Sequence, residues 1–85
     1  MPRRHESKAA LIARIRREFD SYAPSILLTE QEAGPAVSQS PHTLKFWRSH
    51  APEKGPRPVY LLNQVRYEVA ELRRWVAATQ TESAA

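Results

Sequence analysis

The sequence predicts a mainly α-helical domain with a small β-hairpin, in the order helix, helix-turn-helix, hairpin and helix. Three observations carry this prediction: apolar residues recur with helical spacing, capping residues precede two short helices, and two β-prone runs lie close together before the last helix. A chain of 85 residues is the size of one small domain. We expect residues 1–24 to form a helical extension, 25–78 to form the domain, and 79–85 to be a flexible tail.

The first helix is predicted to run from residue 6 or 7 to residue 21, with Ser7 as its N-cap and Pro24 as its stop. One face is apolar and consists of Leu11, Ile12, Ile15, Phe19 and Tyr22. Arg14 and Arg17 are expected to point the other way. We expect the apolar face to dock on the rest of the domain, and a free face for oligomerisation is the alternative.

The second helix is predicted from its capping signal. Thr29 and Glu32 have the spacing of a capping box, in which each side chain bonds the backbone N–H of the other residue. The helix should be short, ending near residue 37, because Pro35 distorts the backbone beside it. Residues 38–39 are predicted to form a tight turn.

The third helix is predicted to begin after Ser40, which is a favourable N-cap, and Pro41 then occupies the first helical position, where proline is preferred. It should end near residue 50. Leu44 and Trp47 share the predicted inner face. The predicted outer face consists of His42, Lys45, Phe46 and Ser49.

Two β-prone runs, 59–62 and 65–67, predict a hairpin that turns at Asn63 and Gln64, since Asn tolerates positive φ. The last helix is predicted over 69–78. Its buried stripe consists of Val69, Leu72, Trp75 and Val76. We expect the two tryptophans, at positions 47 and 75, to be large central side chains of the core.

Composition bounds the function. The chain has no cysteine, and its three histidines are too scattered to suggest a zinc site, so we expect no metal and no cofactor. No apolar run is long enough to cross a bilayer and no signal peptide is recognisable, which predicts a cytoplasmic protein without a membrane partner. The serines lack a base and an acid at a recognisable spacing, so we do not expect an enzyme.

Positive charge is concentrated in one segment. The whole chain has a net charge of +4, and residues 42–66, with five lysines or arginines and one glutamate, have the same net charge on their own. Clustered cations attract a polyanion, and a capped helix with a basic outer face is typical of a helix that enters the DNA major groove. The candidate DNA contacts are Ser40, His42, Thr43, Lys45, Phe46, Arg48, Arg57, Asn63 and Arg66. A second candidate contact consists of Arg14 and Arg17, for which a solvated helix face is the alternative.

Two blocks of sequence carry a resemblance to a known family. They are LLTEQEAGPAVSQSPHTLKFWRS and PVYLLNQVRYEVAELRRWV. In this order they resemble the MerR-like winged helix-turn-helix of excisionases (recombination directionality factors) and of AlpA-type regulators, over about residues 27–76. The resemblance implies that Thr43 and its outer neighbours contact DNA and that Arg66 contacts the DNA backbone.

The chain departs from the family pattern at two places. Val37-Ser38-Gln39 stands where the family often has Leu-Gly-Val, and Phe46 stands where the family often has Arg. Phe46 cannot make a bidentate contact with guanine. We expect it either to pack on a thymine methyl group or to be covered by the N-terminal helix.

The resemblance implies a bacterial, DNA-associated architectural factor. Several copies would bind double-stranded DNA cooperatively, bend an attachment site, and help an integrase of the tyrosine-recombinase class to excise an element. The chain lacks the long coiled coil through which the larger MerR regulators dimerise, which favours action in several copies. An AlpA-type transcription regulator is the alternative on the same fold. A protein-interaction adaptor that presents the N-terminal helix or Phe46 is the alternative of another class.

Overall fold

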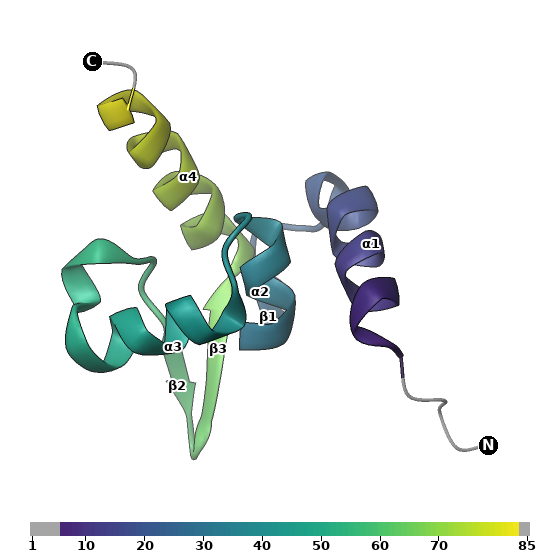
Figure 1. Ribbon diagram of the computed structural model, residues 1–85, viewed down its shortest axis with the longest axis horizontal. Helices are drawn as coiled ribbons and strands as arrows, with labels where there is room; N and C mark the ends of the chain where they lie inside the picture. Colours follow the sequence, from purple (N-terminus) through teal and green to yellow (C-terminus); the bar gives the residue numbers. More distant parts are fainter. Residues whose placement is uncertain (1–5, 84–85) are drawn as a thin grey trace.

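The computed structural model describes residues 6–83, and in this range the chain is mainly helical with a small antiparallel sheet, as predicted (Figure 1). The α-helices are α1 (Lys8–Glu18), α2 (Glu30–Ala36), α3 (Pro41–His50) and α4 (Val69–Ser83). The strands are β1 (Leu27–Leu28), β2 (Val59–Leu61) and β3 (Gln64–Glu68), in the spatial order β1-β3-β2. Two short 3₁₀ segments are η1 (Phe19–Ser21) and η2 (Pro52–Lys54). The two-residue strand β1 was not predicted, because a strand of this length has no periodicity to detect.

Helix α1 lies against α2, so the expected docking of the N-terminal extension is confirmed (Figure 1). Ser7 caps the helix by accepting a hydrogen bond from the Ala10 N–H at 3.1 Å, and Ile15 is fully buried. The prediction that Arg14 points away from the domain is wrong. Its guanidinium donates to the Glu32 carboxylate and to the Tyr22 hydroxyl, each at 3.2 Å, because an arginine stem is long enough to cross the helix surface to charged partners.

The end of the extension is fixed to α4 by Arg73. Its Nη2 donates to three backbone carbonyls of the segment that closes α1, at 3.2, 3.3 and 2.8 Å; these belong to Phe19, Asp20 and Tyr22. The guanidinium also lies 5.5 Å from the centroid of the Phe19 ring. The Phe19 carbonyl also accepts from the Tyr22 N–H at 3.1 Å. Carbonyls at a helix C-terminus often lack partners within the helix, and one arginine bonds three carbonyls of this segment here.

The second helix begins as predicted. Thr29 Oγ1 accepts from the Glu32 N–H at 3.2 Å, and Glu32 Oε1 accepts from the Thr29 N–H at 2.9 Å, so both halves of the capping box are present. Pro35 lies inside the helix and is buried. The helix has only 7 residues before it reaches the turn that leads to α3, in agreement with its predicted shortness.

The turn between α2 and α3 is closed by backbone bonds. The Gln39 N–H donates to the Gly34 carbonyl at 2.9 Å and the Ser38 N–H donates to the Pro35 carbonyl at 3.3 Å. This is the Schellman pattern, which needs a left-handed residue after the helix end, and Ser38 takes that position with φ of 61°. Gly34 is packed so closely that an added Cβ would lie 2.7 Å from the Gln39 carbonyl oxygen.

The hairpin differs from the prediction by one residue. Leu61 pairs with Gln64, so the turn residues are Leu62 and Asn63 and not Asn63 and Gln64. Leu62 has φ of 55°, the conformation expected of Asn63. The observed register places Tyr60 opposite Val65 and Val59 opposite Arg66, so that Leu62 and not Asn63 takes the positive φ.

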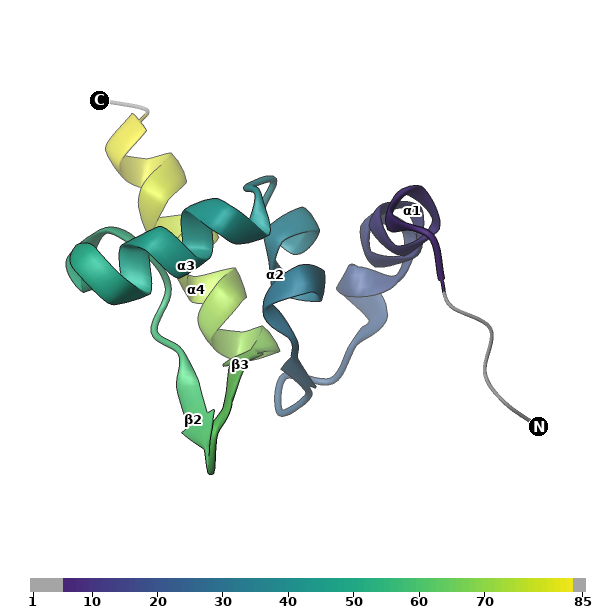
Figure 2. The ribbon, with the colours of Figure 1, turned by 60° about the horizontal axis from the view of Figure 1, so that its bottom comes forward.

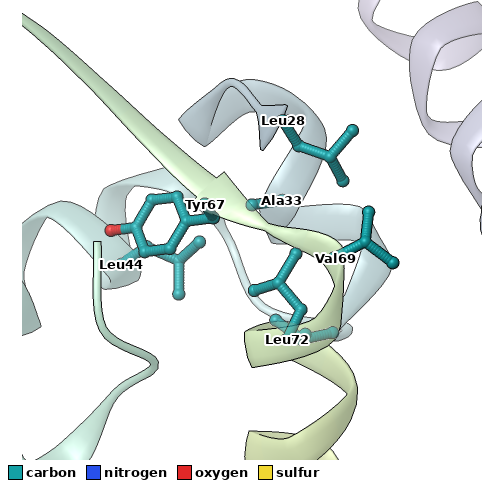
Figure 3. Close-up of a cluster of buried hydrophobic side chains, with 7 residues drawn as sticks. Leu28, Ala33, Leu44, Tyr67, Val69 and Leu72 are labelled. Carbon is teal, nitrogen blue, oxygen red and sulfur yellow. The ribbon is translucent and has the colours of Figure 1, made fainter. Parts of the chain in front are cut away.

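The core lies between α2, α3, α4 and β3 (Figure 3). Its fully buried members include Tyr67, Leu44, Val69 and Leu72. The tryptophans are less central than expected. Their rings lie 5.7 Å apart and pack on the edge of this cluster, half-buried, and Trp75 Nε1 donates to the Lys54 carbonyl at 3.1 Å. The central aromatic side chain is therefore Tyr67.

Helix α4 continues beyond its predicted end near residue 78 and runs to Ser83. Residues 79–83 of the predicted tail are thus helical, and residues 84–85 lie outside the described range. Lack of a stop signal after residue 78 explains the extension, since neither Gly nor Pro occurs in this segment. No helix in the described residues is long and apolar enough to cross a membrane.

Candidate nucleic-acid interface

The outer face of α3 is exposed as predicted. His42, Lys45, Phe46 and Ser49 are all exposed, whereas Leu44 on the opposite face is 1% exposed. Turning the molecule shows α3 and the β2–β3 hairpin at one end and α1 at the other (Figure 2). Among the described residues, the exposed side chains of this face are therefore not covered by α1.

The first turn of α3 is organised by its cap. Ser40 Oγ accepts from the Thr43 N–H at 3.0 Å and shares a 2.8 Å hydrogen bond with Thr43 Oγ1. The Leu44 N–H bonds the Ser40 carbonyl at 3.2 Å. Ser40 and Thr43, two candidate DNA contacts, thus hold each other in place at the exposed start of the helix. An anion at this end would meet the positive end of the helix dipole.

Phe46 is 52% exposed, and its ring stacks on that of His50, with centroids 4.8 Å apart and planes 16° apart. The expectation that the N-terminal helix covers Phe46 is wrong, because α1 docks on α2 instead. The stack gives α3 a flat aromatic surface beside Lys45. Such a surface suits the apolar methyl group of thymine better than a hydrogen-bonding base edge.

Arg48 is the candidate contact with the strongest internal partners. Its Nε and Nη2 donate to the two carboxylate oxygens of Glu30 at 2.8 and 3.2 Å, and the Tyr67 hydroxyl donates to the same carboxylate at 3.0 Å. This geometry is bidentate, and it raises the pKa of the Arg48 guanidinium. Burial and the neighbouring Glu30 carboxylate raise the pKa of the Tyr67 hydroxyl well above its usual range. The three side chains join α2, α3 and β3, and we call them the Glu30 network.

The arginine of the hairpin, unlike Arg48, has no carboxylate partner among the described residues. Arg66 lies on the side of β3 opposite to Tyr67, and its guanidinium bonds the Val65 carbonyl at 2.9 Å and the Gln64 side-chain oxygen at 3.0 Å. Asn63 occupies the exposed turn. Arg57 precedes β2, and its backbone N–H bonds the Glu71 carboxylate at 3.0 Å. None of the ion pairs in the described residues involves Lys45, Arg57 or Arg66.

The two arginines of the second candidate contact, Arg14 and Arg17, have different surroundings in the structure. Arg14 is held by carboxylates, and its ion pairs with Glu6 and Glu32 raise its pKa. Arg17 is exposed and pairs with its neighbour Glu18 at 3.2 Å. Both lie on α1, whereas the other candidate contacts lie at or near α3 and the hairpin (Figure 2). The structure therefore does not join them to the main candidate surface.

Sequence reasoning missed the Glu30 network and the tip of the hairpin. Arg48 and Glu30 are 18 residues apart, so no local spacing signals their pairing. Position 62 was assigned to an apolar strand, so its exposure was not predicted.

A scan against protein-family models, a search of curated proteins and a search of solved structures each found no match to this chain.

Proposed function

We propose that this protein binds double-stranded DNA with the outer face of α3 in the major groove and the β2–β3 hairpin as a wing beside it. The single observation that carries the proposal is the distribution of cations. Lys45, Lys54, Arg57 and Arg66 have no carboxylate partner for their side chains among the described residues, and all lie between the start of α3 and the end of the hairpin. Lys8 and Arg16, on α1, have none either. Positive groups that no internal acid neutralises are the ones that displace counterions from DNA.

The paired arginines support this interpretation by contrast. Arg48 and Arg14 bond carboxylates, and Arg73 bonds backbone carbonyls, so these three act within the fold. Phosphate contacts made by the cations that have no carboxylate partner would position α3, and its exposed residues would then reach base edges. In this proposal His42, Lys45 and Phe46 read the major groove. Arg66 and Asn63 contact the backbone from the wing.

The finer proposal is an architectural factor of the excisionase type, acting in several copies on an attachment site with a tyrosine-recombinase integrase. It rests on the two sequence blocks that resemble that family, which map onto the segment from β1 to α4. A transcription regulator of the AlpA type is the second candidate, supported by the same blocks. An excision assay with the cognate integrase separates them, because a regulator changes promoter output without integrase.

DNA binding itself is tested by salt dependence. Fluorescence anisotropy with a labelled duplex should show an affinity that falls with a log–log slope of roughly −4 to −5 if about five phosphates are contacted. Lys45→Ala and Arg66→Ala should each reduce the slope by about 1, and only Lys45→Ala should also alter sequence preference.

The matched control is Arg74→Ala, since Arg74 is exposed on α4 and pairs with Glu71. Its slope should equal that of the unmodified protein. Arg17→Ala tests the second candidate contact in the same titration. A double variant Lys45→Ala/Arg66→Ala that binds as well as the unmodified protein would refute this surface. Absence of binding at low salt would favour an adaptor that binds protein.

A further inference from the structure

The tip of the hairpin carries an apolar side chain that nothing in the described residues covers. Leu62 is 100% exposed, the highest value among the large hydrophobic residues described. It also has φ of 55°, a left-handed conformation that costs a residue with a Cβ free energy. Neither packing nor backbone preference accounts for leucine at this position. A strained, exposed residue at the end of a hairpin therefore points to a role outside the fold.

The surroundings of Leu62 indicate what it meets. Asn63 and Gln64 come directly after it, and Arg66 extends along the strand towards the tip by bonding Gln64. Tyr60 and Leu61, which precede Leu62, are also exposed, at 61% and 42%. The hairpin thus presents apolar carbon on one side of its tip, and hydrogen-bonding side chains and a cation with no acidic partner among the described residues on the other. Phosphates and base edges can satisfy such donors, whereas an apolar protein surface would leave them unsatisfied.

We propose that Leu62 is a wedge that enters the minor groove and partly separates one stacked base step, thereby kinking the DNA. Leucine is one of the side chains that unstack base steps in this way. The proposal rests on the proposed DNA binding and adds its mechanism of bending. With α3 in the major groove, the hairpin reaches past the backbone, and its tip is the part that projects farthest from the helices (Figures 1 and 2).

The experiment compares two labelled duplexes of identical sequence, one continuous and one nicked in a single strand at its centre. The nick removes much of the cost of unstacking, so a wedge binds the nicked duplex more tightly, by about tenfold. Leu62→Gly removes the side chain and suits the positive φ, and it should bind both duplexes equally. Leu62→Met retains an apolar tip and should keep the preference. Leu61→Ala, at the adjacent position, is the control and should also keep it.

End-to-end energy transfer on the continuous duplex gives the second readout. The unmodified protein and Leu61→Ala should shorten the distance between the ends, and Leu62→Gly should not. Equal binding of the unmodified protein to both duplexes would overturn the wedge while leaving DNA binding intact. Loss of self-association in Leu62→Gly without any effect on bending would also overturn it, because the tip would then be a contact between copies. Failure to bind either duplex at low salt would refute the proposed function itself.

Discussion

The turn between α2 and α3 and the turn of the β2–β3 hairpin share one irregularity and differ in everything around it. Each places a residue other than glycine at positive φ, Ser38 at 61° and Leu62 at 55°. Around Ser38, backbone bonds to α2 and the close approach of Gly34 fix the conformation. Around Leu62 no packing does so among the described residues. The first irregularity is explained by the fold, and for the second the proposed contact with DNA offers an explanation.

The largest effect should come from the Glu30 network, which fixes α2, α3 and β3 on either side of the first turn. Glu30→Ala leaves the Arg48 guanidinium and the Tyr67 hydroxyl, both mostly buried, without their acceptor. We expect the free energy of unfolding to fall by about 2–4 kcal/mol. Urea denaturation measures it, and Glu53→Ala, at an exposed position, is the control. A loss no larger than that of the control would mean that the network does not hold the helices together.

The second largest effect should come from Gly34→Ala, which tests the close packing of the turn between α2 and α3. In Gly34→Ala the new Cβ would lie 2.7 Å from the Gln39 carbonyl oxygen and 3.0 Å from Pro41 Cδ, so backbone must move. We expect a loss of about 2 kcal/mol in the free energy of unfolding. Gly55→Ala is the comparison variant: its Cβ would lie 2.8 Å from the half-buried Trp47 ring, so a side chain and not backbone must give, and we expect a smaller loss. Equal losses would show that the turn is no tighter than the loop after α3.

Local and non-local signals explain what the sequence could predict. The caps at Ser7, Thr29 and Ser40 were predictable because each bonds a residue three positions away. Their helices were therefore placed correctly at the N-terminal ends. The exposed face of α3 was predictable from helical periodicity.

The features that could not be predicted depend on residues far apart in the sequence. The partner of Arg48 is 18 residues away, and so is the Glu32 partner of Arg14, so both arginines were counted as surface charge. The hairpin register likewise departs from the local turn preference, since Leu62 and not Asn63 takes the positive φ. A count of charged residues in the sequence therefore overestimates the number of cations that are available to a ligand.

Tyr67→Phe tests the Glu30 network further, through the pH dependence of the free energy of unfolding. The hydroxyl bonds Glu30, so its loss should cost about 1–2 kcal/mol at neutral pH. Its pKa is raised in the folded state from an ordinary value of 10.0, so the unfolded chain loses this proton first. Stability from this group is fully present below that value and falls as the pH rises beyond it, by up to about 1.4 kcal/mol per pH unit. Stability curves between neutral and alkaline pH should therefore converge for Tyr67→Phe and the unmodified protein. Parallel curves would contradict the buried, neutral hydroxyl.

The smallest effect on the free energy of unfolding should come from glycine substitutions that compare the two turns directly. Ser38→Gly and Leu62→Gly each relieve a left-handed residue, and glycine's greater freedom in the unfolded chain offsets part of that gain, so each should raise the free energy of unfolding by about 0.5 kcal/mol. Thermal unfolding at matched concentration resolves such a difference in a domain of this size.

Their effects on DNA should differ. Ser38→Gly should leave the preference for nicked DNA unchanged, since Ser38 belongs to a turn that internal bonds already define. Leu62→Gly should stabilise the protein and abolish that preference, because the proposed wedge assigns the leucine a contact with DNA and the described residues give it no packing partner. If Leu62→Gly instead destabilised the protein, the side chain would have a packing partner in solution, and its exposure would no longer argue for a contact with DNA. The sign of this small change therefore decides whether the irregularity at the hairpin tip belongs to the fold or to the ligand.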